Sequence, residues 1–515
     1  YSFEPDPISY HFLNRNIQSN NFTNVFSARK AVSNKKGTVS LYKNSLDSSM
    51  NSLIKRKGSH KTIQIDCIAL YDFIGNEHVD VIKMDIEGAE PFALEGMRKT
   101  IEKNRTYMKS KTPYHPPQKI LERYADVLVN FGLNGGKGIR RGETVLLIIS
   151  ESARPLLIEL RKTITRAGGN IILRYIPEDE ARYTFSKDFY LLAQKHQLEY
   201  FPRHHFKGTV EDTDHVLTVL SEDPNGLKGA PVDKISTHTQ VLTTLRSLYR
   251  KKEEKGTLTW SLALYGTEEQ AREAGLSLKA YWEQIIRACF LDTPNPISQW
   301  KNIFKKLEKY RNKLTALKIK SVHIKGPDTD LTILLGKKRK WLGGGGSNIP
   351  TFEIFVSPDW RGTEGWMKFN QPLYYLGNKI AGVELWFKNG VVVKSKAKTN
   401  HTLLQKMIAA TNGDKVGEFS LTDKRFSRIT KFMAHTLFDE NMGGKNGNTH
   451  IALGSAYKES YTGDAKKTTP KEWGTLGFNE SSVHTDIIST APRTVTATLA
   501  NGKEKVIYRN GMFTL

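Results

Sequence analysis

The sequence contains very little cysteine and no long apolar run. Only Cys67 and Cys289 occur among 515 residues, which excludes a disulfide framework and favours a reducing compartment, so we expect a cytoplasmic protein. No run of about 18 apolar residues is present, so we expect neither a membrane-spanning helix nor a membrane partner. Hydrophobic residues still make up 38% of the chain, and a length of 515 residues predicts two to four domains.

The common catalytic signatures are also absent. The chain has no HExxH zinc motif, no CxxC pair, no phosphate-binding P-loop and no GxSxG nucleophile turn. Candidate chemistry is therefore confined to histidines and carboxylates scattered after residue 350.

Acidic residues are outnumbered by basic ones. There are 77 Lys and Arg against 53 Asp and Glu, which gives a net charge of +24 and points first to nucleic acid. The basic residues are spread along helical faces, and the densest run, residues 337–340, lacks the interleaved aromatics of a base-stacking surface. We interpret this run as a solvated hairpin or loop and expect no nucleic-acid partner. A basic nucleic-acid-associated protein remains the alternative from the binding class.

Three regions that differ in their patterns of apolar and polar residues predict an α/β and α+β multidomain fold. Residues 1–105 alternate polar loops with short strand-like runs, at 38–42 and 79–84. Residues 106–320 have an α/β pattern, whereas hairpin signals dominate residues 321–515. We expect three domains with these bounds, and the last is expected to be strand-rich.

Local patterns predict individual elements. Apolar runs over 143–150 and 170–176, with a helix between them, predict a strand–helix–strand unit. Apolar residues at helical spacing over 278–290 predict a helix, which makes the cysteine within it a core residue. The GGGGS segment at 343–347 has the composition of a linker, but its position between strand-like runs favours a backbone-permissive loop.

His484 and Asp486 form the sharpest single pair. Residues i and i+2 of a strand share a face, so both side chains point to one side while Val483 and Ile487 face the core. An imidazole and a carboxylate on one face can ligate one divalent metal, or one metal each of a pair. The alternative is a hydrogen-bonded pair at the surface.

Three further polar residues lie inside short apolar runs. Glu353, Glu418 and His450 each interrupt such a run. A buried carboxylate needs a cation or a hydrogen-bond partner, so each acidic residue either meets such a group or reaches solvent at a strand end. Together with the pair at 484 and 486, these features fit a shared metal site better than four separate exceptions.

From about Pro116 onward, the chain resembles the thermophilic metallo-aminopeptidase family of the aminopeptidase S and T type. Five segments carry the resemblance, in this order: NIPTFEIFVSPDWRGTEG, GEFSLTD, HTLFDEN, THIALGSAY and SSVHTDII. The resemblance implies a two-metal exopeptidase that removes N-terminal residues from peptides with a free N-terminus. It also implies a homodimer.

The same resemblance assigns roles to residues. By motif position, the implied metal ligands are Glu353, Glu418, Glu440, His450, His484 and Asp486. Such a set suits two divalent ions, namely Zn, Co, Mn or Mg. Glu418 is the candidate for the carboxylate that bridges the metals or takes the water proton. Tyr457 matches the catalytic tyrosine of the family and can donate a hydrogen bond to the oxyanion of the tetrahedral intermediate.

Residues 1–105 resemble the second half of an FkbM-type S-adenosylmethionine-dependent methyltransferase. YSFEPDP, the Asn-rich stretch 14–24 and VDVIKMDIEGAEPFALEGM carry this resemblance. It implies that Glu4 meets the cofactor ribose and that Asp85, at a strand end, faces the cofactor or the substrate. The first strand and its Gly-rich turn would precede Tyr1. We therefore expect a truncated Rossmann-like fragment without methyl transfer, from a truncated or joined gene product or a natural fusion. A methyltransferase of this type is the enzymatic alternative.

Overall fold

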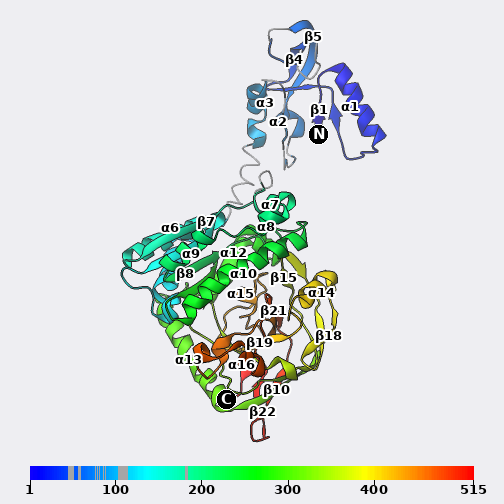
Figure 1. Cartoon of the computed structure of the whole chain (residues 1–515). Coiled ribbons are helices and arrows are strands. Elements are labelled where there is room, and N and C mark those ends of the chain that lie inside the picture. The colour runs from blue at the N-terminus through cyan, green and yellow to red at the C-terminus, as the bar shows by residue number, and fades with distance from the viewer. Residues whose placement is uncertain are drawn as a thin grey trace. The chain divides into compact units, whose positions relative to one another are not determined.

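The chain divides into two compact units, Tyr1–Tyr114 and His115–Leu515 (Figure 1). The computed structural model describes residues 1–44, 51–55, 59–75, 77, 79, 82–84, 86, 89–101, 114–179 and 184–515. Within these ranges, no helix is both long enough and apolar enough to cross a membrane.

The first unit contains two small sheets. Its strands are β1 (Ser2–Phe3), β2 (Ser27–Ala28), β3 (Ala31–Ser33), β4 (Gly37–Asn44) and β5 (Ser59–Ala69), and its helices are α1 (Pro7–Ser19), α2 (Leu70–Ile74) and α3 (Glu90–Gly96). Strands β1 and β2 pair in parallel, and the second sheet has the order β3-β5-β4. Helix α1 begins after Asp6, whose carboxylate accepts hydrogen bonds from the backbone N–H groups of Ile8 and Ser9.

The sequence-based expectations for this unit are met only in part. The run at 38–42 lies within β4, as predicted. In the run at 79–84, residues 79 and 82–84 belong to no strand, and residues 80 and 81 lie outside the described residues. A Rossmann-like sheet is not confirmed in the described part of this unit, whose sheets have two and three strands.

The second unit begins with a parallel sheet of order β12-β9-β8-β6-β7. Its strands are β6 (Thr144–Ser150), β7 (Asn170–Ile176), β8 (His215–Leu220), β9 (Thr259–Leu264) and β12 (Asn348–Ile349). The main helices of this part are α5 (Gln118–Val127), α6 (Arg154–Arg166), α9 (Arg203–Asp212), α10 (Val232–Glu254), α12 (Leu278–Ala288) and α13 (Pro296–Ala316). The unit β6–α6–β7 confirms the predicted strand–helix–strand pattern. Helix α12 begins at the predicted cap, Ser277, whose hydroxyl accepts a hydrogen bond from the N–H of Ala280, and Cys289 is fully buried.

The strand-rich part contains an eight-stranded antiparallel sheet, with the order β18-β17-β14-β11-β10-β22-β23-β24. Its strands are β10 (Ile319–Gly326), β11 (Thr329–Leu334), β14 (Glu364–Lys368), β17 (Glu384–Lys388), β18 (Val391–Lys396), β22 (Thr494–Leu499), β23 (Glu504–Arg509) and β24 (Met512–Phe513). The turn between β17 and β18 is Asn389-Gly390, with φ of 52° and 81°. Left-handed φ angles at both turn residues are typical of tight hairpins.

The strand-rich part also contains a smaller antiparallel sheet, with the order β13-β19-β20-β21. Its strands are β13 (Glu353–Val356), β19 (Val416–Thr422), β20 (Asn448–Gly454) and β21 (His484–Ser489). Every residue of β19 and β20 is buried. One face is apolar and carries side chains such as Phe419, Ile451 and Ile487. Burying each such side chain stabilises the fold by about 1.5–3 kcal/mol, which fixes the register of the sheet.

Strand β19 contains a bulge at Gly417. Val416 pairs with Leu453 but Glu418 pairs with Ala452, so one extra residue is inserted on β19. Val416 therefore shares the apolar face with Leu453, whereas Glu418 points to the opposite face. A side chain at Gly417 would overlap the carbonyl groups of Gly454 and Ser455, so glycine is required there.

The glycine run before β12 is a fixed loop. Residues 343–346 have φ angles of 143°, 70°, 125° and 85°, which residues with side chains rarely adopt. A side chain at Gly346 would also overlap the carbonyl of Gly132. The expected backbone-permissive loop is therefore confirmed.

Candidate metal centre

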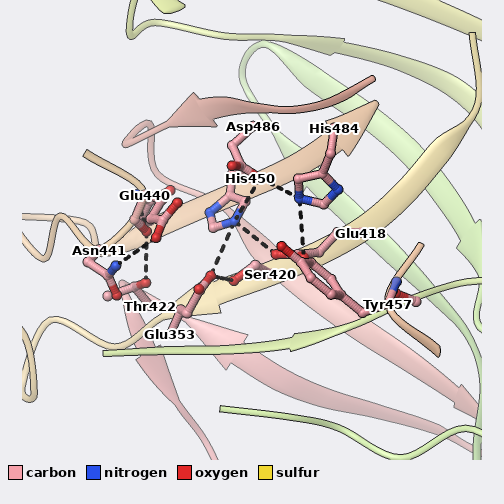
Figure 2. Close-up of polar contacts among 12 residues, drawn as sticks. Glu353, Glu418, Ser420, Thr422, Glu440, Asn441, His450, Tyr457, His484 and Asp486 are labelled. Atoms are coloured by element: carbon pink, nitrogen blue, oxygen red, sulfur yellow. Dashed lines mark hydrogen bonds and ion pairs between the residues drawn. The ribbon is translucent and has the colours of Figure 1, made fainter. Parts of the chain in front are cut away.

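The polar face of the four-stranded sheet gathers five of the candidate side chains (Figure 2). Residues paired across antiparallel strands project to the same side. The pairs Ser420–His450, Glu418–Ala452 and Ala452–Asp486 therefore place Glu418, His450 and Asp486 on one face. His484 joins them through its pairing with Gly454, and Glu353 projects from the neighbouring strand β13.

His450 lies at the centre of the group. Its Nε2 atom is 3.3 Å from Glu353 Oε2, 3.4 Å from Glu418 Oε1 and 3.8 Å from Asp486 Oδ1 (Figure 2). Glu353, Glu418 and His450 are all buried, and their ligand atoms lie within 4.8 Å of one another. One imidazole nitrogen is thus surrounded by three carboxylates.

His484 approaches the same carboxylates from the cavity side. Its Nε2 atom is 3.9 Å from Glu418 Oε2 and 3.8 Å from Asp486 Oδ1. Its Nδ1 atom is 2.8 Å from the carbonyl oxygen of Ser455. Because a carbonyl only accepts, Nδ1 carries the proton, and in the neutral ring the lone pair is on Nε2. This orientation is the one that a metal-binding histidine adopts.

Glu440 lies at the edge of the group, immediately after α15 (Thr436–Asp439). Its Oε1 atom accepts hydrogen bonds from Asn348 Nδ2 at 3.1 Å and from Asn441 Nδ2 at 3.2 Å. Together with Glu353, Glu418 and Asp486 it lines a cavity of about 360 Å³. Amide donors hold this carboxylate, so it is positioned beside the three carboxylates around His450 and does not touch His450 itself.

Tyr457 lies in the loop after β20 and forms part of the wall of the same cavity. Its ring centroid is 4.9 Å from that of His484, at an interplanar angle of 70°. The residue remains 37% exposed, so a bound molecule can reach it. Desolvation and the neighbouring carboxylates raise the pKa of its phenol well above the usual value, which keeps Tyr457 a hydrogen-bond donor at neutral pH.

The close packing of the carboxylates shifts the pKa values of Glu418, Glu440 and His450. Burial, with further repulsion from Glu353 and Asp486, raises the pKa of Glu418 to about 7. Burial likewise raises the pKa of Glu440 well above its ordinary value. Burial opposes the charged form of His450, but its contacts with Glu353 and Glu418 outweigh that effect and raise its pKa. In the protein alone, the raised pKa values mean that some of these side chains keep a proton, which reduces the repulsion among the carboxylates.

The donor set fits divalent metal ions. Among the described residues, no lysine or arginine forms an ion pair with Glu353, Glu418, Glu440 or Asp486, and their ion pairs are with histidines alone. Buried carboxylates without cations are costly. Two imidazole nitrogens and four carboxylates supply the nitrogen and oxygen ligands that Zn, Co and Mn accept.

Three supporting residues were not identified from the sequence. Ser420 donates a hydrogen bond of 2.7 Å to Glu353 Oε2, and Asn348 and Asn441 donate to Glu440. Ser420 lies two residues after Glu418, so strand alternation could have indicated it. Asn348 comes from β12 in the parallel sheet, and no local pattern connects it to the site.

The first unit supplies two candidate residues, Glu4 and Asp85, and only Glu4 is among the residues that the structure describes. The Glu4 carboxylate accepts a hydrogen bond of 2.9 Å from the N–H of Asp6, and burial raises its pKa. This contact closes a local turn before α1. Asp85 lies outside the described residues.

Two protein families match this chain. Residues 117–513 match the thermophilic metalloprotease (M29) family, and residues 1–131 match the methyltransferase FkbM domain.

Individual relatives cover nearly the same region. Aminopeptidase PepS of Streptococcus thermophilus is 27% identical over 417 residues, which are 76% of this chain and 97% of that protein. Aminopeptidase AmpS of Bacillus subtilis is 27% identical over 419 residues, again 76% and 97%. The solved structure of AmpT from Thermus thermophilus matches with a TM-score of 0.67 and 24% identity, over 77% of this chain and all of that chain, which shows a shared fold. Because the M29 match spans well over half of its residues, the chain belongs to the thermophilic metalloprotease (M29) family.

Proposed function

We propose that this chain is a two-metal aminopeptidase that hydrolyses the N-terminal peptide bond of peptides with a metal-activated water. The observation that carries the proposal is the set of two histidines and four carboxylates at one buried cavity, with no lysine or arginine paired to these carboxylates among the described residues. Support also comes from the relatives, which are named aminopeptidases.

The ligand roles follow from which atoms face one another. Nε2 of His450 and Nε2 of His484 would each hold a metal, and the Glu418 carboxylate, which faces both rings, is the candidate bridge. Glu353, Asp486 and Glu440 would complete the coordination. When bound, two divalent ions polarise the substrate carbonyl and lower the pKa of a water towards neutrality.

Glu418 and Tyr457 are the catalytic candidates. The Glu418 carboxylate faces both histidine rings, so it would either bridge the metals or accept the proton of the attacking water and return it to the leaving amine. The Tyr457 phenol, protonated and partly exposed in the same cavity, can donate a hydrogen bond to the oxyanion. Both groups are held on one face of the sheet or beside it, so little reorganisation is needed.

The test is hydrolysis of leucine p-nitroanilide by the full chain. We expect EDTA to abolish turnover and added Zn, Co, Mn or Mg to restore it. We also expect N-acetyl-leucine p-nitroanilide to resist cleavage, because an aminopeptidase requires the free amine. Turnover that persists after complete metal removal, or equal cleavage of the acetylated substrate, would contradict the proposal.

We further propose that the region from residue 106 onward is sufficient for this activity, with an α/β domain over 106–320 and a metal-binding domain over 321–515, and that it acts as a homodimer. Residues 1–105 would then be a methyltransferase-like fragment without transferase activity. Support for this division comes from the match of the M29 family, which begins only at residue 117. A methyltransferase function of the whole chain is less favoured, since its family matches residues 1–131 alone.

A further inference from the structure

A second cavity adjoins the metal centre. It has a volume of about 630 Å³ and shares six lining residues with the cavity that holds the candidate ligands, namely Arg250, Glu254, Ala456, Tyr457, Lys458 and His484. Because Tyr457 and His484 line both spaces, a molecule bound at the metal centre can extend into the second cavity.

Three cations of α10 line this second cavity. They are Arg246, Arg250 and Lys251, and all three are exposed. Residues four apart share a helix face, so Arg246 and Arg250 project to the same side. In the part of the chain that the structure describes, no carboxylate lies within 4.0 Å of their charged nitrogens. Glu254 and Glu480 also line the cavity but leave these three cations without an ion pair.

The linings of the two cavities differ in the sign of their excess charge. Around the metal centre, Glu253, Glu254, Glu459 and the four candidate carboxylate ligands outnumber the cations Arg250, Arg311 and Lys458. In the second cavity, Arg246, Arg250, Lys251 and Lys458 outnumber Glu254 and Glu480. The second cavity has three unpaired cations from one helix. A peptide with a free amine at its N-terminus and a carboxylate further along the chain has charges that complement the two cavities. Its positive amine would lie near the carboxylates of the metal centre, and its negative carboxylate would lie near the cations of the second cavity. Charged walls attract and orient such a ligand.

We propose that the cavity lined by Arg246, Arg250 and Lys251 binds a substrate carboxylate on the C-terminal side of the scissile bond. This inference rests on the proposed aminopeptidase function and names its substrate class. The carboxylate has two possible sources, the C-terminus of a short peptide or an acidic side chain of a longer one. A guanidinium binds either in the same bidentate geometry.

The test compares Arg246→Gln/Lys251→Gln with the matched control Lys301→Gln/Lys305→Gln, which removes two exposed cations from α13 instead. Four substrates are used: leucine p-nitroanilide, Leu-Ala-Ala-Ala as the free acid, the same peptide as its C-terminal amide, and the amide with glutamate at its third position. We expect wild type and control to cleave the free acid about tenfold faster in kcat/KM than its neutral amide. This preference should shrink as ionic strength rises.

In Arg246→Gln/Lys251→Gln the preference should fall to about twofold, while leucine p-nitroanilide, which has no carboxylate, is cleaved at the wild-type rate. A charge-reversed variant, Arg246→Glu/Lys251→Glu, should prefer the neutral amide. Faster cleavage of the glutamate-containing amide than of the neutral amide identifies the side chain as a source of the carboxylate. Equal cleavage of those two identifies the C-terminus alone.

Wild-type protein that cleaves all three peptides equally, or a double variant with an unchanged preference for the free acid, would overturn the inference. If leucine p-nitroanilide is not hydrolysed by wild type with added metal, the proposed function itself fails. The two failures are therefore distinguishable.

Discussion

Replacing Glu418 with glutamine removes one charge from the centre of the site and keeps the size of the side chain. The residue is 3% exposed and faces both His450 and His484. Without this carboxylate, either the attacking water loses its candidate base or the two metals lose their candidate bridge. General acid–base catalysis accelerates a reaction by about 10²–10⁴-fold. We therefore expect Glu418→Gln to lower kcat for leucine p-nitroanilide by at least about 10²-fold.

The same substitution has a measurable effect on the stability of the metal-free protein. The pKa of Glu418 is raised from 4.5 to about 7, so the folded protein keeps a proton that the unfolded chain releases between those pH values. The free energy of unfolding therefore falls as pH rises from 4.5 to 7, by about 3 kcal/mol from this group. Glutamine does not ionise, so Glu418→Gln should lose this part of the pH dependence.

Urea unfolding in EDTA at pH 5 and pH 8, followed by tryptophan fluorescence, measures the difference. Wild type should lose about 3 kcal/mol more than Glu418→Gln between the two pH values. A folded variant with wild-type turnover would refute the catalytic role. An identical pH dependence in both proteins would refute the assignment of the buried charge to Glu418.

Three other experiments probe the site and the domain organisation. His484→Ala and Asp486→Ala should each lower the metal content measured by mass spectrometry, whereas Thr485→Ala, on the opposite strand face, should not; full occupancy in either ligand variant would contradict the assignment. Tyr457→Phe should lower kcat by about 10²-fold with little change in metal content, and an unchanged kcat would exclude its role at the oxyanion. Deletion of residues 1–105 should leave peptidase activity intact, and calorimetry should detect no S-adenosylmethionine binding to either form; a loss of activity, or micromolar binding, would contradict this.

Local patterns predicted those elements in which the spacing of residues along the sequence directly matches the geometry of the strand, helix or loop. The run at 143–150, the helix capped by Ser277 and the positive-φ loop at 343–346 are all observed. The shared face of His484 and Asp486 is observed as well, because the alternation of a strand is independent of its neighbours. These features depend on residues close together in the chain.

Features that depend on distant residues could not be predicted. The sequence does not show that β13 pairs with β19, so the 3.3 Å approach of Glu353 to His450 could not be derived from it, although their positions inside apolar runs indicated a shared metal site. Arg339 lies in the run interpreted as solvated, yet its guanidinium is 3.7 Å from the centre of the Phe478 ring and bonds the carbonyl of Leu476. These two partners are more than 130 residues away in sequence, and no local pattern reveals them.

The bulge at Gly417 has a consequence for how this site can vary among related chains. In a regular strand residues two apart share one face, so without the bulge Val416 and Glu418 would project to the same side of the sheet. Adding a side chain at Gly417 would displace the backbone of Ser455, whose carbonyl sets which nitrogen of His484 faces the carboxylates. Gly417 therefore restricts substitution at this position, although it offers no ligand atom to the site.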